Sequence, residues 1–266
     1  MFVSFVSDFG LTDEFVGVVH GVIARLAPTV RVIDVTHGIP PGGVRAGALV
    51  LSRAIQYLPE GVALAVVDPG VGGERAAVAV ETSWGTFIGP DNGLLAPAVA
   101  MTGGGVRAVT IDNPEMSIPS AGATFEGRDR FAPAAALVAS DQVELMELGR
   151  EIDPSTLTPL MLPLPEVTEE GVDGEVWWVD RFGNAETNIA PEHLSELGLQ
   201  VGDALEARIG GESHVLTWVK SYVDGEPGRP VAVVDSAGLV SLAVNGGRAN
   251  EQLRAFDRTA VRFTRP

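Results

Sequence analysis

Residues 62–75 read VALAVVDPGVGGER, and this stretch decides the fold class. Six apolar residues form a run that is typical of a buried strand, and the run ends on Asp68. A proline and three glycines then turn the chain, and Arg75 closes the loop. In an α/β sheet, ligands lie beyond the carboxyl ends of the strands, so this pair is a candidate for chemistry. An ordinary turn with a surface Asp–Arg pair is the alternative.

Strands and helices alternate on both sides of this stretch. Hydrophobic spacing predicts further strands at 2–6 and 30–35, two strands within 75–89, and helices over 14–27, 44–58 and 130–140. Pro133 falls in the first turn of the last helix, where a missing N–H costs little. The alternation predicts a three-layer α/β domain with a mostly parallel sheet over residues 1–153.

The second part of the chain has a different composition. Residues 154–170 are rich in proline and show no periodicity, which predicts a linker. Short strands with glycine and aspartate turns follow over residues 171–266. They predict a small β-barrel domain, with a sandwich as the alternative arrangement.

Composition limits the classes of function. The 266 residues carry a net charge of −17, which disfavours nucleic acid and anionic membrane surfaces as partners, although solubility alone also accounts for it. The absence of cysteine excludes disulfides and thiolate metal sites. We expect no metal, because none of the four histidines has ligand spacing, and His20 falls among the packed positions of a helix. Without an apolar membrane span or a basic leader, the expected location is cytoplasmic.

Carboxylates follow two of the predicted strands. Asp8 and Asp68 come at strand ends, so a parallel sheet would bring both to one edge. A carboxylate such as Asp8 can accept hydrogen bonds from both hydroxyls of a ribose. Asp13 lies just before a helix, where capping by Thr12 or Asp13 is the alternative to a binding role.

Three further motifs carry polar groups. Residues 123–133, ATFEGRDRFAP, gather charges around Gly127 and form either a site or an exposed helix start. Residues 179–189, VDRFGNAETNI, combine an acid, an aromatic ring and an amide, which suit an amino group and a purine. Residues 233–253 place Asp235 and Ser236 at a strand end and then a glycine pair through which a backbone can approach a flat ligand.

These motifs occur together in a recognisable order. SDFGLTDEFVGVVHG, VDPGVGGER, PDNGLL, TFEGRDRFAPAAA, VDRFGNAETNI and SLAVNGG cover nearly the whole chain. The chain resembles the S-adenosyl-L-methionine (SAM) hydroxide adenosyltransferases, which are related to the fluorinase and chlorinase enzymes. The resemblance implies hydrolysis of SAM to adenosine and methionine without a metal or cofactor. It also implies a homotrimer in which each substrate lies between the N-terminal domain of one subunit and the C-terminal domain of the next.

The resemblance assigns expected roles to individual residues. Asp68 and Arg75 would handle the attacking water, and Asp8 the ribose. Glu126 stands where these hydrolases usually carry histidine, which gives an Asp–Arg–Glu set at the water. The expected substrate contacts in the C-terminal domain are Asp180 for the methionine ammonium, Ser236 for its carboxylate, and Phe182, Asn184 and Gly246 for adenine. Asp13, Phe125, Gly127 and Asn245 complete the expected binding set. A SAM or adenosine binder without turnover and a halogenase are the alternatives.

Overall fold

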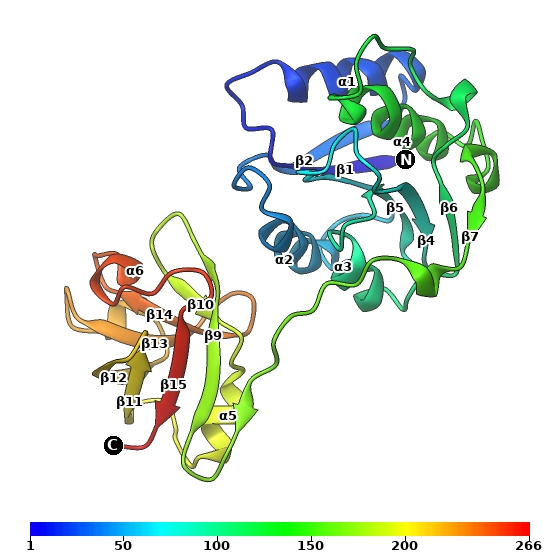
Figure 1. Ribbon diagram of the computed structural model, residues 1–266. Coiled ribbons are helices and arrows are strands. Elements are labelled where there is room, and N and C mark those ends of the chain that lie inside the picture. The colour runs from blue at the N-terminus through cyan, green and yellow to red at the C-terminus, as the bar shows by residue number, and fades with distance from the viewer. The chain divides into compact units, whose positions relative to one another are not determined.

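The computed structural model describes all 266 residues and divides into two compact units, Met1–Leu160 and Met161–Pro266 (Figure 1). The first unit holds a seven-stranded sheet with helices on both faces, and the second holds a barrel. This α/β class with a C-terminal barrel confirms the fold predicted from the sequence.

The sheet of the first unit has the strand order β2-β1-β3-β5-β4-β6-β7. The pairings β2–β1, β1–β3 and β3–β5 are parallel. Only β4 and β7 run against the other strands, so the sheet is mostly parallel. The strands are β1 Phe2–Ser7, β2 Arg31–Thr36, β3 Gly61–Val66, β4 Ala77–Glu81, β5 Gly85–Pro90, β6 Arg107–Thr110 and β7 Glu151–Ile152.

Side-chain alternation along β3 explains the three layers. Val62, Leu64 and Val66 pack into one core with α1 and α4, whereas Ala63 and Ala65 face a second core with α2 and α3. A strand buried on both faces reads as a continuous apolar run, which is the pattern of residues 62–67. Figure 1 shows one helix pair on each side of the sheet. The helices are α1 Phe15–Leu26, α2 Val44–Ile55, α3 Ala96–Met101 and α4 Ala132–Ala139.

The topology brings the polar strand ends together. β1 and β3 are parallel neighbours with Ser7 opposite Val66, so Asp8 and Asp68 follow at the same edge of the sheet. Asn92 reinforces this edge, because its amide donates to the carbonyl of Val67 at 2.9 Å.

The second unit is a closed barrel. Its strands follow the order β10-β14-β13-β12-β11-β15-β9, and β9 pairs back to β10, while β8 adds to β9 outside the ring. Closure leaves one shared interior, so the arrangement is not a two-sheet sandwich. The strands are β8 Glu166–Val167, β9 Val172–Val179, β10 Ala185–Thr187, β11 Ala204–Ile209, β12 Glu212–Val219, β13 Pro230–Val234, β14 Val240–Val244 and β15 Ala260–Thr264, with short helices α5 Pro191–Glu196 and α6 Ala249–Gln252.

The expected linker, 154–170, contributes to both units. Thr158 donates its backbone N–H to Asp91 at 2.8 Å, and Leu157 and Leu160 pack on a core of the first unit. From Met161 onward the chain belongs to the second unit.

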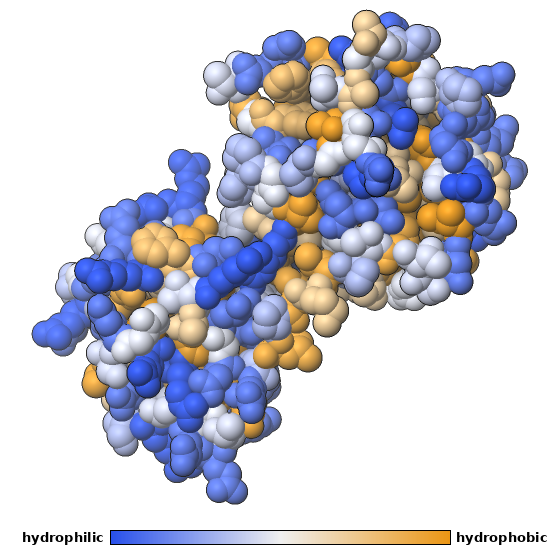
Figure 2. Space-filling view, in the orientation of Figure 1, coloured by the Kyte–Doolittle hydropathy of each residue, from blue (hydrophilic) through white to orange (hydrophobic).

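Hydrophilic residues are interspersed with smaller hydrophobic groups on the visible face of each unit (Figure 2). None of the helices has the length and the apolar character that a membrane crossing needs.

Candidate active site

A buried ion cluster forms beyond the carboxyl end of β3. Arg75 donates from Nε to both carboxylate oxygens of Asp68, at 3.0 Å each, and its Nη2 also donates to Asp68. The same Nη2 donates to Glu126, which comes from a distant part of the sequence. The three side chains are only 5–11% exposed. The structure therefore brings together the three residues that the sequence analysis placed at the water.

The loop of residues 68–75, which carries Asp68 and Arg75, has a tight local geometry. Val71 donates to the carbonyl of Asp68 at 3.2 Å, which turns the chain directly after the strand. Gly72 has φ +74°, and a Cβ there would lie 2.9 Å from the carbonyl oxygen of Ala123. Only glycine suits that conformation and that approach. This contact joins the loop of 68–75 to the loop before Glu126.

Arg75 holds its positive charge firmly. Burial opposes that charge, but the hydrogen bonds to Asp68 and Glu126 outweigh burial and raise the pKa of Arg75 above its usual value. Its guanidinium also lies 5.6 Å from the ring centroid of buried Phe131. The cation is therefore a fixed part of the site.

A second arginine balances the two acids. Nη1 of Arg130 lies 3.3 Å from Oε1 of Glu126, one helical turn later. Two carboxylates, Asp68 and Glu126, thus face two guanidinium groups. The sequence analysis included Arg130 in a charge cluster but gave it no role; its i,i+4 spacing from Glu126 was the signal available.

An aromatic cluster packs at the residues that flank Glu126 in the sequence. The rings of Phe9, Phe15 and Phe125 pack edge to face or tilted, with centroids 5.0–5.9 Å apart. Gly127 is buried against them, because a Cβ there would lie 2.9 Å from Phe9 Cζ. Phe125 and Gly127 therefore lie beside the ion cluster.

Asp8 and Asp13 occupy the neighbouring loop. The carboxylate of Asp8 accepts a hydrogen bond from the backbone N–H of Gly42 at 2.7 Å. Asp13 is exposed, and α1 begins after Glu14 without any side-chain cap. The capping role considered for Thr12 or Asp13 is therefore not seen.

In the second unit, Asp180 organises a turn between β9 and β10. Its Oδ1 accepts from the backbone N–H groups of Phe182 and Asn184 at 2.8 and 2.9 Å, and its Oδ2 accepts from the Asn184 amide at 2.8 Å. Phe182 is 69% exposed. The turn thus presents an aromatic face beside a fixed carboxylate.

The remaining expected residues lie on two other turns of the barrel. Ser236 is exposed in the turn after β13. Asn245 donates its amide to the carbonyl of Gly225 at 2.9 Å, and Gly246 has φ +76° with open space around it.

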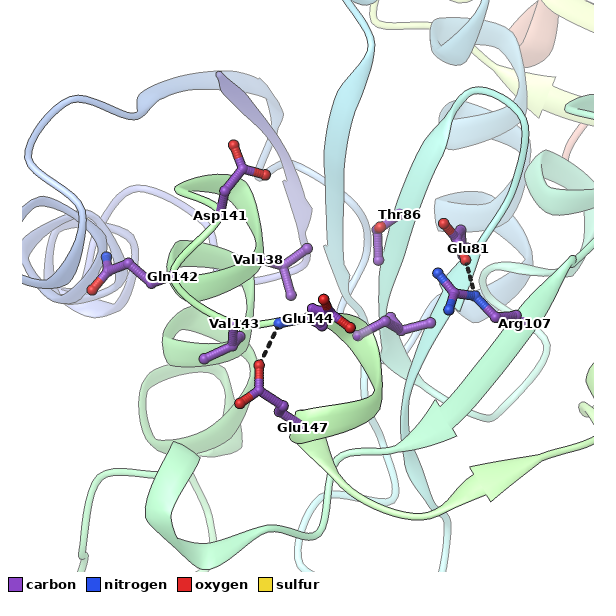
Figure 3. A pocket seen from close by; sticks show the side chains of 10 residues that line it. Glu81, Thr86, Arg107, Val138, Asp141, Gln142, Val143, Glu144 and Glu147 are labelled. Carbon is purple, nitrogen blue, oxygen red and sulfur yellow. Dashed lines mark hydrogen bonds and ion pairs between the residues drawn. The ribbon is translucent and has the colours of Figure 1, made fainter.

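A separate pocket of about 660 Å³ lies in the first unit (Figure 3). Acidic residues surround it, with Arg107 donating to Glu81 at 2.5 Å and Glu147 accepting from the Glu144 N–H at 2.7 Å. Thr86, which lines it, stands near the start of β5, so the pocket is at the opposite sheet edge from Asp68. None of the expected site residues lines it.

Comparison with known proteins places this geometry in a family. Residues 3–149 match the SAM hydroxide adenosyltransferase N-terminal domain, and residues 174–262 match the C-terminal domain of the same family. The chain belongs to the SAM hydroxide adenosyltransferase family. The resemblance inferred from the motifs is therefore confirmed.

Individual members of the family are similar over the full length. The chain is 44% identical to a protein of Salinispora tropica named (R)-S-adenosyl-L-methionine hydrolase, covering 98% of this chain and 97% of that one. A fluorinase of Actinopolyspora mzabensis is 29% identical, covering 99% and 97%. A crystal structure of an uncharacterized conserved protein from Thermotoga maritima has a TM-score of 0.91 at 34% identity, covering 99% and 100%.

Proposed function

We propose that this member of the family hydrolyses SAM to adenosine and L-methionine. The observation that carries the proposal is the buried Asp68–Arg75–Glu126 cluster at a strand end. The similarity to relatives named as SAM hydrolases supports it. The expectation of an enzyme rather than a binding protein rests on the same two grounds.

The proposed reaction is a substitution at the ribose C5′. The water oxygen forms a bond to C5′ as the C5′–S bond breaks, and the electron pair of that bond leaves with sulfur. Methionine departs as a neutral thioether, so the leaving group needs no proton and no general acid is required. The water loses one proton overall. The task of the site is to orient a partly desolvated water in line with the C–S bond.

Asp68 is suited to hold that water. Oδ2 accepts two hydrogen bonds from Arg75, but Oδ1 accepts only one, so Oδ1 keeps a lone pair that can accept from a water. The carboxylate can then take the proton as the bond to C5′ forms. Arg75 keeps the carboxylate in place and offsets charge on the developing hydroxide. The Asp68 carboxylate can accept a hydrogen bond from a water but not from a halide ion, which has no proton to donate, and this supports water over a halogenase reaction.

Substrate contacts are proposed in both units. Asp8 would bind the ribose hydroxyls, with Asp13, Phe125 and Gly127 nearby in the first unit. In the barrel, we assign the methionine end to Asp180 and Ser236 and the adenine to Phe182, Asn184, Asn245 and Gly246. No cofactor is needed for this chemistry, and SAM is the small-molecule substrate.

A homotrimer with shared sites is part of the proposal, as is a cytoplasmic location. Light scattering should give about three times the 27.8 kDa chain mass. Asp68→Asn and Asp180→Ala place their defects in different units, so each variant alone should have little activity at a SAM concentration well below the KM of Asp180→Ala. In trimers assembled from equal amounts of the two variants, about a quarter of the sites should be active. Each active site combines the intact first unit of an Asp180→Ala subunit with the intact second unit of an Asp68→Asn subunit. No recovery on mixing would contradict shared sites.

The configuration at sulfur is the finer question of substrate. The names of the relatives specify the R epimer, and we propose the same preference here. Incubation with each SAM epimer, followed by chromatography, should show adenosine and methionine in equal amounts and faster from the R epimer. Equal rates would contradict the preference. Absence of adenosine from both epimers would contradict the hydrolase proposal.

A further inference from the structure

Four side chains, Ser7, His37, Asp34 and His20, form a hydrogen-bonded network beside the proposed ribose-binding loop, which we call the Ser7–His20 network. Ser7 Oγ and His37 Nδ1 are 2.7 Å apart, and His37 Nε2 lies 3.0 Å from Asp34 Oδ1. His20 Nε2 lies 2.8 Å from the same oxygen of Asp34. The Ser7–His20 network begins at the fully buried Ser7 and ends at His20, whose side chain is 35% exposed. His20 is thus bound to Asp34 and only partly packed, unlike the packed helix residue expected from its position.

The hydrogen-bond partners define the role of each group. Burial alone would raise the pKa of Asp34, but the bonds from His20 and His37 outweigh burial and lower it, so Asp34 is the anion of the Ser7–His20 network. His37 Nε2–H therefore donates to Asp34. Ser7 Oγ also accepts from the Phe9 N–H at 3.3 Å, so the one hydroxyl joins the backbone of the loop after β1 to the His37 ring.

The set has the residue types of a Ser–His–Asp triad, but it does not have the accessibility of one. Ser7 has no exposed surface, because it is the last residue of β1 inside the sheet. A substrate carbonyl cannot reach its hydroxyl. The Ser7–His20 network therefore has a positioning role rather than a nucleophilic one.

Backbone contacts show which loops the Ser7–His20 network holds in place. The carbonyl of His37 accepts from the N–H of Gly10 at 2.8 Å, and the N–H of Gly42 donates to the carboxylate of Asp8 at 2.7 Å. The loop after β1 is therefore tied to the loop after β2 at two points, the His37 carbonyl and the Gly42 N–H. The His37 side chain is 3% exposed, and its ring packs edge-on against Phe5 with centroids 4.6 Å apart.

We propose that His37, held by Ser7 and Asp34, is a positioning residue that fixes Asp8 for binding the ribose. The inference rests on the proposed function, in which Asp8 accepts from the ribose hydroxyls. Loss of the Ser7–His37 bond should release both loops and weaken substrate binding. The water-handling cluster lies on other loops, so the rate of the bound substrate should change little.

Steady-state kinetics with SAM tests this assignment. Ser7→Ala and His37→Gln should each raise KM about tenfold, as expected for loss of a buried hydrogen bond, and leave kcat within about threefold. Ser52→Ala is the matched control, because it removes a buried serine hydroxyl that bonds only within α2, to the carbonyl of Ala48. It should change neither constant. A fall in kcat at constant KM in the Ser7 and His37 variants would overturn the proposal.

Coupling to Asp8 provides the second arm. If His37 acts through Asp8, the double variant Asp8→Ala, His37→Gln should have the same KM as Asp8→Ala alone. Multiplied effects would overturn the proposal.

Hydrogen exchange of the unliganded protein separates this inference from the proposed function. The amides of Gly10 and Gly42 should exchange faster in Ser7→Ala and His37→Gln than in wild type and Ser52→Ala. Unchanged exchange would overturn the positioning role. Faster exchange in a protein that forms no adenosine from SAM would support the role of His37 in the loops and reject the hydrolase function instead.

Discussion

The central feature at the residue scale is one arginine shared by two carboxylates. Arg75 bonds to both Asp68 and Glu126, and Arg130 adds a second cation on the far side of Glu126. Two acids near one water would repel each other, but two guanidinium groups compensate their charge. The sequence placed Asp68 and Arg75 on one loop. It did not indicate that Arg75 also bonds to Glu126, because 51 residues separate them and only the fold brings them together.

Asp68→Asn should lower kcat about 100- to 10,000-fold with a small change in KM, because it removes the acceptor for the water proton. Glu74→Gln is the control, since Glu74 is an exposed acid on the same loop. Asp180→Ala should instead mainly raise KM. The reverse pattern in Asp68→Asn and Asp180→Ala would refute the assigned roles.

Glu126→Ala should slow turnover and leave substrate affinity within a few fold, because Arg75 then loses one of its two anchors. Glu126→His should keep or raise turnover, because it introduces the histidine that the resemblance implies at this position. Arg130→Ala should slow the wild type but not the Glu126→His variant, in which Arg130 has no carboxylate to hold. Kinetics across about pH 5 to 9 measure these effects. If Glu126→Ala had the wild-type rate at every pH, Glu126 would have no role in turnover.

At the scale of elements, β1 to β5 and the long helices of the first unit were predicted, whereas β6, β7 and the loop contacts were not. The predicted helix 44–58 ends at Ile55, because a periodic pattern does not mark where the last turn stops. The π-helical turn Gly127–Phe131 before α4 was not predicted. The hydrogen-bonded Ser7–His20 network was also not predicted. Its available signal was that Ser7 and His37 stand at the ends of adjacent parallel strands.

Gly127 tests the packing of that turn against the aromatic rings. Gly127→Ala should lower the free energy of unfolding by about 1–3 kcal/mol, because its Cβ would lie 2.9 Å from Phe9 and the rings must move. Gly17→Ala, in α1, has open space around its Cβ and should raise stability by about 0.5–1 kcal/mol. Urea unfolding gives both values. Equal effects of the two substitutions would contradict the close packing of Gly127.

At the scale of the whole molecule, two units built on different principles carry the proposed residues. The first unit supplies the ion cluster on a mostly parallel sheet, and the second supplies turns of a closed barrel. The fold class followed from the hydrophobic spacing of strands and helices, and the family followed from the order of the motifs along the sequence. Individual contacts in the barrel did not, because Asp180 satisfies its own turn with three hydrogen bonds that the sequence does not display.

Asp34 links the stability of the molecule to pH. Its pKa is lowered on folding, so the stabilisation is present above its usual value of 3.8 and is lost as pH falls through the lower folded-state pKa. Asp34→Asn should therefore be less stable than wild type at pH 6, and the difference should shrink towards pH 3. Urea unfolding across this range measures it. A difference that grows on acidification would contradict the assignment.

The claim that water attacks C5′ is tested most directly by an isotope. The protein is incubated with the R epimer of SAM in heavy-oxygen water that also contains chloride and fluoride, and the products are separated and weighed by mass spectrometry. The account predicts adenosine with the heavy oxygen at its 5′ position and an equal amount of unlabelled methionine. Unlabelled adenosine, a 5′-halogenated product, or bound SAM without any product would contradict it.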